Sequence, residues 1–304
     1  MATETSVETI WHVPDDLWSL IAPLFGPEKR PGTPGRPAVP FRRVFDGIIY
    51  VLRTGCQWSA IPRQEFAPKS TVWGRFKQWA EAGLFQQAWA LVLHYYDLEL
   101  GIDWKWQAMD GVITKAPLGG EATGPSPVDR AKSGTKRSVL SDGRGAPLSV
   151  IVAGANAPDK RLALETLDSL PVDRPTRLIN RLHHLSLDAG YDYADVVAGV
   201  LERDYILHLR PPASTPLEVP PQKKHPARRW VVERTHAWHN RFRRLLVRRE
   251  KKLDHYYPDD RLGFSAHHLT HHMFGQYLNS EFSDRLLARK FCERTHRRLS
   301  DEIV

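Results

Sequence analysis

Three acidic side chains occupy positions from which they could gather metal ions. Asp110 lies in the alternating apolar segment WKWQAMDGVITKA, Asp188 follows the short run HLSL, and Glu233 lies in WVVERTHAWHNRF. Two aspartates at strands and a glutamate on a helix can converge on one edge of a sheet. Carboxylate oxygens suit Mg²⁺ or Mn²⁺, and a pair of such ions activates the attacking oxygen and stabilises the leaving oxygen at a phosphate.

Glu233 stands in a strongly cationic stretch. Residues 223–252 hold twelve Lys and Arg against two acids, a net charge of +10 where the whole chain carries +8. Two interpretations remain open. Glu233 either pairs with Arg229 on a solvated helix face, for roughly 0.2–0.5 kcal/mol, or binds metal where the surrounding cations hold a polyanion.

A single helix is expected to carry Glu233, from His225 to Leu246. At 100° per residue its apolar side is predicted to face the core and Glu233 to face away. The predicted core side consists of Val231, Trp238, Phe242, Leu245 and Leu246; the predicted Glu233 side also holds Arg229, His236, Ala237 and Asn240.

The elements around Asp110 and Asp188 read as an α/β sheet. A strand containing Asp110 is followed by a hairpin, with KRSVLS and APLSVIVAG as its arms and Asp142–Gly145 as its turn. A helix over 158–170, a strand ending at Asp188, a helix over 193–203 and a strand at 205–210 follow. Strands first and alternating units afterwards favour a sheet with helices packed on it.

The first hundred residues are predicted to be helical. A helix at 14–24 and a Pro/Gly-rich linker at 26–40 precede a helix from Phe41, which Gly55 ends. A further helix starts with Ser70 as its N-cap and stops at Gly83, and another covers 84–98. Helix, short turn and helix predict DNA contact, with an ordinary helical bundle as the alternative. The candidate contacts are Ser70, Thr71, Arg75 and Lys77.

Composition narrows the class of protein. A chain of 304 residues has room for about two domains. No apolar run is long enough to span a membrane and no secretory signal is evident, so a cytoplasmic protein is expected. Two separate cysteines fit a reducing compartment. A pI near 9.5 with concentrated positive charge points to nucleic acid or another polyanion.

Several segments, in order, resemble DDE transposases of bacterial insertion sequences, close to insertion-sequence family five. The segments are GRPAVPFRRVFDGIIYVLRTGCQWSAIP, AMDGVITKAPLGG, GTKRSVLSDGRGAPLSVIVAGAN, LDAGYDY and RRWVVERTHAWHNRFRRL, within about 14–257. Arg229 matches the arginine of the family's Tyr-Arg-Glu-Lys signature. Pro226 and Asn240 stand at its tyrosine and lysine positions, which leaves Arg241 or Arg244 for the lysine's work on phosphates.

The resemblance implies an RNase H-like mixed sheet with flanking helices (101–257) behind an all-α helix-turn-helix domain (1–100). It implies catalysis and Mg²⁺ or Mn²⁺ binding by Asp110, Asp188 and Glu233. The expected reaction cleaves element ends and joins their 3′-hydroxyls to target DNA, with a homodimer on the terminal inverted repeats. Residues expected to hold DNA phosphates around Glu233 are Arg229, Arg241, Arg243, Arg244 and Arg248.

Other functions compete with this one. A repressor or an inactive transposase remnant would bind DNA without cutting it, and an RNA-directed nuclease would differ in substrate. Residues 258–304 depart from the family after Tyr257 and form a divergent tail, with a helix predicted at 265–278 and loose packing at 280–304.

Overall fold

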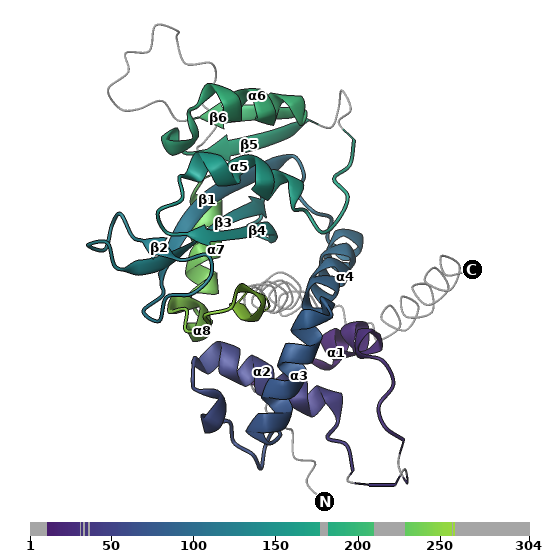
Figure 1. The fold of residues 1–304 in the computed structure, drawn as a ribbon. Coiled ribbons are helices and arrows are strands. Elements are labelled where there is room, and N and C mark those ends of the chain that lie inside the picture. The colour runs from purple at the N-terminus through teal and green to yellow at the C-terminus, as the bar shows by residue number, and fades with distance from the viewer. Residues whose placement is uncertain are drawn as a thin grey trace, which may run out of the picture.

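The computed structural model describes residues 11–256 except 31, 33, 36, 177–181 and 210–228, and also residue 258. The predicted tail helix, the loosely packed end and the first residues of the predicted 225–246 helix lie outside the described residues. Figure 1 shows a helical part built by the first hundred residues and a sheet part that follows it. None of the described helices combines the length and the apolarity that crossing a membrane requires.

The helical part follows the predicted order. Its elements are α1 (Asp15–Ile21), η1 (Ala22–Phe25), α2 (Phe41–Thr54), η2 (Trp58–Ala60), α3 (Lys69–Glu81) and α4 (Leu84–Glu99). The i, i+3, i+4 repeat of apolar residues in α2 is buried, including Phe45, Ile48 and Leu52. Gly55 ends α2 in the left-handed conformation, as predicted.

Two details of the predicted helix-turn-helix differ from the prediction. Pro68, not Ser70, precedes the first residue of α3, because the helix starts one residue before the serine. The connection between α2 and α3 runs from Gly55 to Pro68, 14 residues with η2 inside it. A helix-turn-helix has a turn of three to four residues, so the expected short turn is wrong, although α3 does pack against α2.

The sheet has the predicted mixed α/β character. Its six strands within the described residues are β1 (Trp106–Lys115), β2 (Gly124–Pro125), β3 (Ser133–Asp142), β4 (Pro147–Gly154), β5 (His183–Leu187) and β6 (Tyr205–Leu209). They lie in the order β4-β3-β1-β5-β6, and β2 pairs with the start of β3. β1 is antiparallel to β3 and parallel to β5, which is the arrangement of an RNase H-like sheet.

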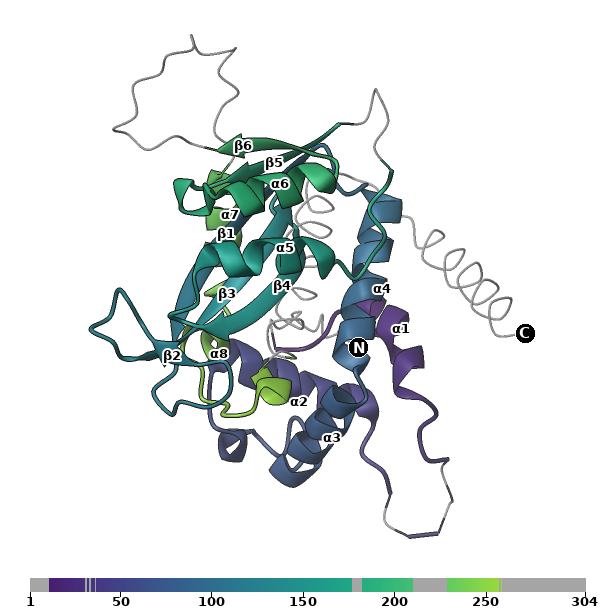
Figure 2. The same ribbon diagram turned by 45° about the horizontal axis from the view of Figure 1, so that its top comes forward.

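Helices cover both faces of this sheet. They are α5 (Asp159–Asp168), η3 (Ala189–Tyr191), α6 (Ala194–Glu202), α7 (Trp230–His239) and α8 (Arg243–Leu246). α5 packs on β3 and β4 and α6 on β6, whereas α7 packs on β1 and β3 from the other side (Figure 2).

The predicted single helix around Glu233 is broken. α7 ends at His239, and α8 begins at Arg243 after Phe242 takes an extended conformation. The break turns Phe242 and Leu245 into the core, and Leu246 is left 44% exposed. His236 is buried, so its predicted place beside Glu233 on the exposed side is wrong.

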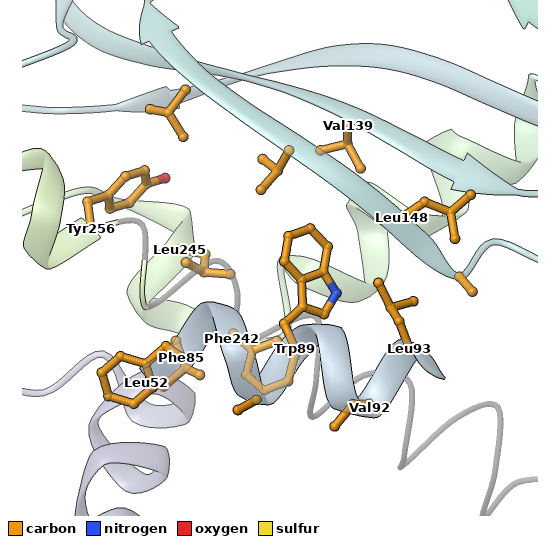
Figure 3. Packing of buried hydrophobic residues seen from close by; sticks show 14 of the residues in the cluster. Leu52, Phe85, Trp89, Val92, Leu93, Val139, Leu148, Phe242, Leu245 and Tyr256 are labelled. Atoms are coloured by element: carbon orange, nitrogen blue, oxygen red, sulfur yellow. The ribbon is translucent and has the colours of Figure 1, made fainter. Parts of the chain in front are cut away.

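One hydrophobic cluster joins the helical part to the sheet. Figure 3 shows Trp89 and Leu93 of α4 facing Val139 and Leu148 of β3 and β4, with Phe242 and Leu245 from the segment after Glu233 beside them. In addition, Arg53 of α2 lies over the Phe242 ring at 5.0 Å. The two predicted domains therefore share a core.

Candidate active site

The two aspartates are carried by neighbouring parallel strands. Asp110 is in the middle of β1, and Asp188 immediately follows β5. Ala108 is paired with Ser186. Because both strands run in the same direction, two further residues along each bring Asp110 and Asp188 level with one another. Strand pairing thus places side chains that are 78 residues apart in the chain at one end of the β1–β5 pair.

Glu233 comes to the same place through Arg229, the residue before α7. Arg229 Nη1 lies 2.6 Å from Asp188 Oδ1, and Arg229 Nη2 lies 3.1 Å from Glu233 Oε1. The Arg229–Glu233 ion pair of the simpler interpretation is therefore present. However, the same guanidinium also holds Asp188, so the pair is part of an acidic cluster and not an isolated helix-surface contact.

Asp110 is the most buried acid of the three. Burial, with smaller contributions from the nearby Asp188 and Asp159 carboxylates, raises the pKa of Asp110 to about 6. A hydrogen bond from the Gly111 backbone N–H (2.8 Å) and the Arg229 charge act in the opposite direction. A carboxylate with raised pKa among other acids is a group whose ionised form needs a nearby cation.

The donor set fits a hard divalent cation, because it consists of carboxylate oxygens with Asp188 and Glu233 partly exposed, 38% and 52% as side chains. Among the described residues, no three acidic, histidine or cysteine side chains are close enough to share one ion. Arg229 lies between Asp188 and Glu233, so it would have to leave at least one of them for a cation to bind both.

Two residues that the sequence did not single out complete the surroundings. Asp159, the first residue of α5, packs against Gly111, where an added Cβ would lie 2.5 Å from Asp159 Oδ1. Lys136 Nζ, on buried β3, lies 3.0 Å from the same oxygen. The sequence marks Asp159 only as an acid at a helix start. Its place beside the residue after Asp110 depends on how α5 packs on the sheet.

His236 contributes no charge to this region. Burial and the neighbouring Arg137 guanidinium lower the pKa of His236 to about 3. The imidazole is therefore neutral at physiological pH. The imidazole is buried on the side of α7 that faces the sheet, away from the exposed Glu233 carboxylate.

The predicted phosphate-binding arginines divide into two groups. Arg241 and Arg243 are exposed, and Arg229 is half-buried at the acids. Arg244 and Arg248 are buried, with 5% and 1% exposure, and this corrects their predicted role in DNA contact. Arg244 pairs with Glu250 and donates to the Cys56 carbonyl.

Arg248 is buried because of the path that the chain takes after α8. Val247 forms a parallel bridge with Lys115, so the chain here behaves as an added strand with alternating sides. Arg248 then points inward. Its guanidinium donates to Thr135 Oγ1 at 2.8 Å and to the Glu250 carbonyl at 2.8 Å.

The candidate contacts on α3 differ in accessibility. Ser70 is exposed, whereas Thr71, Arg75 and Lys77 are half-buried. Arg75 donates to Gln78 Oε1 at 2.7 Å and lies over the Phe41 ring at 5.0 Å, so part of its side chain is used in packing. The N-terminal turn of α3 is the most open part of this predicted reading surface.

The comparison with known proteins agrees with this architecture. Residues 13–89 match the family described as "Putative transposase of IS4/5 family", and residues 107–255, which include all three acids, match "Transposase DDE domain". The chain is 34% identical over 149 residues to a putative transposase for insertion sequence element IS402 of Burkholderia cepacia. This match covers 47% of the chain and 66% of that relative, just under two thirds.

A second relative matches a smaller share of this chain, but the match spans more of the relative's own length. The chain is 33% identical over 118 residues to an uncharacterized 16.2 kDa protein of insertion element IS402 from the same organism, 38% of this chain and 80% of that protein. Taken together, these matches show that the chain belongs to the transposases of the IS4/5 family and contains a transposase DDE domain.

Proposed function

We propose that this chain is a catalytically competent DNA transposase. It cleaves the ends of its element and joins the resulting 3′-hydroxyls to target DNA. The observation that carries the proposal is the pair of ion pairs from Arg229 to Asp188 and Glu233, with Asp110 level with Asp188 on the next strand. A chain that only bound DNA would have no need to place two acids on one arginine beside a third acid whose pKa is raised by burial and by neighbouring carboxylates.

Asp110, Asp188 and Glu233 would hold two divalent cations, Mg²⁺ or Mn²⁺. Bound ions of this kind supply Lewis acidity to the phosphate and lower the pKa of water. In the first step a water oxygen attacks phosphorus, the P–O3′ bond at the element end breaks, and the 3′ oxygen leaves with a proton. In the second step that 3′-hydroxyl attacks a target phosphorus, and the target's P–O3′ bond breaks in turn.

The protein's own part is positioning and charge. Arg229, at the acids, and exposed Arg241 and Arg243 supply cations for the phosphates on either side of the scissile bond. Of the two candidates for the role of the signature lysine, Arg241 is the one that remains, because Arg244 is committed to Glu250. An element has two ends, so a homodimer with one active site per end is part of the proposal, as is action on the bacterial nucleoid in the cytoplasm.

The experiment uses the full chain and a plasmid that carries the DNA flanking its gene, in which terminal inverted repeats are to be located. Incubation with Mg²⁺ or Mn²⁺ is expected to nick the plasmid at the repeats, and EDTA to stop it. Asp110→Asn, Asp188→Asn and Glu233→Gln should each lower cleavage by several orders of magnitude while DNA binding stays within about twofold.

Three outcomes separate the candidate functions. Metal-dependent cleavage lost in all three variants supports the transposase. Repeat-specific binding without cleavage by the wild type would mean a repressor or an inactive remnant. Cleavage of RNA in preference to the plasmid would point to the nuclease. Cleavage that survives in one variant would remove that residue from the site.

A further inference from the structure

α7 cannot set the position of Glu233 by itself. It has ten residues, its first turn has no side-chain cap, and isolated helices of this length are marginal in water. Glu233 is in that first turn and is half exposed. The orientation of its carboxylate must therefore come from contacts that α7 makes with the rest of the protein.

Two consecutive residues of α7 bind the same turn of the sheet, the β3–β4 turn at Asp142–Gly145. Arg234 Nη2 donates to the Arg144 carbonyl at 2.6 Å. The single proton of the Thr235 hydroxyl has two carbonyl acceptors, and Gly145 of the turn, at 2.8 Å, is closer than Val231 of the same helix, at 3.0 Å. Thr235 is completely buried. It follows Glu233 by two residues, about 200° around the helix, so it anchors the side opposite the carboxylate.

The turn is shaped to receive these contacts. Gly145 has φ of +91°, a conformation that favours glycine, and an added Cβ would lie 3.1 Å from Thr235 Oγ1 and 3.2 Å from Arg234 Nη2. Asp142 fixes the turn from inside, because its carboxylate accepts hydrogen bonds from the backbone N–H groups of Arg144 and Ala146 at 2.9 and 2.7 Å.

The turn is also tied to the helical part of the protein. Tyr96 of α4 lies with its hydroxyl 3.3 Å from the Asp142 carboxylate, and Arg144 Nη1 donates to the Leu100 carbonyl at 2.9 Å. A continuous set of contacts thus runs from α4 through the turn to α7.

We infer that Thr235 is a positioning residue for the Glu233 carboxylate, acting through its hydrogen bond to the β3–β4 turn. The inference rests on the proposed function, in which Glu233 holds a divalent cation. A displacement of about 1 Å in such a site can lower the rate about 100-fold. The hydroxyl sets where α7 lies on the sheet, and therefore whether Glu233 meets Asp188 and Asp110.

The test compares Thr235→Val, which keeps the shape and removes the hydrogen bond, with Thr235→Ser, which keeps the bond. Mn²⁺ binding to the full chain is measured by the paramagnetic resonance of free Mn²⁺, together with the cleavage rate of pre-bound DNA, the DNA dissociation constant and the Tm. Valine should weaken Mn²⁺ binding at least about fivefold and slow cleavage about 10- to 100-fold, with DNA binding within twofold. Serine should restore both.

Thr166→Val is the matched control. Thr166 is likewise fully buried, and its hydroxyl bonds within α5 and to Ser138 Oγ, on the opposite side of the sheet from α7. It should lower the Tm and leave Mn²⁺ affinity and cleavage unchanged. Equal losses in Thr166→Val and Thr235→Val would overturn the inference, because a general loss of stability would then explain both.

Other results are equally decisive. Wild-type values in Thr235→Val would overturn the positioning role and leave the transposase proposal standing. A wild type that neither cleaves nor binds Mn²⁺ would overturn the proposed function, and the inference with it. If the wild type binds Mn²⁺ without cleaving, the Mn²⁺ affinities of Thr235→Val and Thr235→Ser decide the inference. Should Thr235→Val fail to fold, Arg234→Met removes the neighbouring half-exposed anchor and is judged by the same measurements.

Discussion

Arg229 Nη1 and Asp188 Oδ1 are 2.6 Å apart, although 41 residues separate them in the chain. The contact joins the end of β5 to the start of α7. Arg229 also pairs with Glu233, so one guanidinium holds an acid from each of these two elements. An arginine that neutralises two acids in this way competes with any cation for the same oxygens. This competition leads to the first prediction.

Arg229→Gln should bind Mn²⁺ about two- to fivefold more tightly than the wild type in the absence of DNA, because partly exposed ion pairs contribute about 0.5–1 kcal/mol. The same variant should cleave DNA at least about tenfold more slowly, since a cation near the phosphates is lost. Arg203→Gln, which breaks the ion pair with Asp168 away from the site, is the control. Weaker Mn²⁺ binding in Arg229→Gln would mean that Arg229 organises the acids and does not compete for them.

Asp110→Asn should make the metal-free protein more stable at neutral pH. The folded pKa of about 6 lies above the ordinary 3.8, so the protonated acid is favoured in the folded state. Its contribution to stability is present below about pH 4 and is lost as the pH rises through 6. In urea unfolding with EDTA, the variant should gain on the order of 1–3 kcal/mol at pH 7 and nothing at pH 4.

The exposed Asp192→Asn serves as the control for that measurement and should follow the wild-type curve. A variant that is less stable than the wild type at pH 7 would contradict the prediction. In that case the ionised Asp110 would be stabilising the fold, and the acid would not have been placed there at a cost in stability.

The exposed and the buried arginines after α7 should differ in their effects on DNA binding and on stability. Arg243→Gln should reduce the slope of log K against log[salt] by about 0.9 and weaken binding to all DNA sequences alike. Arg244→Met should leave that slope unchanged and destabilise the protein by roughly 3–5 kcal/mol, because Glu250 would remain buried without its partner. A flatter slope in Arg244→Met with unchanged stability would show that Arg244 contacts DNA after all.

The start of α3 should carry sequence preference. Ser70→Ala is expected to reduce the preference for element ends over random DNA. The difference between the two binding free energies should shrink by about 1–3 kcal/mol, the contribution of a base-edge contact. Lys77→Gln should weaken both affinities together, as expected for a phosphate contact. The exposed Ser59 of η2 provides a matched control in Ser59→Ala. An unchanged ratio in Ser70→Ala would move the reading surface away from this turn.

Much of the fold follows from local sequence. Alternating and branched residues around Asp110 produced β1, the Asp142–Gly145 turn joined β3 to β4, and the apolar period of Phe41–Leu52 produced α2 with Gly55 at its end. These features depend on periodicity and turn chemistry within about ten residues, which a sequence displays directly. Residue type makes metal binding possible at Asp110, Asp188 and Glu233, because carboxylates are the hard oxygen ligands that Mg²⁺ and Mn²⁺ prefer, but the choice of these three among the 35 acids of the chain came from the family resemblance.

The tertiary structure decided what depends on packing between distant segments. The helix predicted from His225 to Leu246 is broken between His239 and Arg243, and Phe242 and Leu245 beyond the break pack in a core shared with α2 and α4. Arg244 and Arg248 look in sequence like any other cations. Arg244 is held inside by Glu250 and the Cys56 carbonyl, and Arg248 by the bridge between Val247 and Lys115. Asp159 and Thr235 gain their places from the packing of α5 and α7 on the sheet. Charge and periodicity are local properties, whereas burial is a property of the assembled chain.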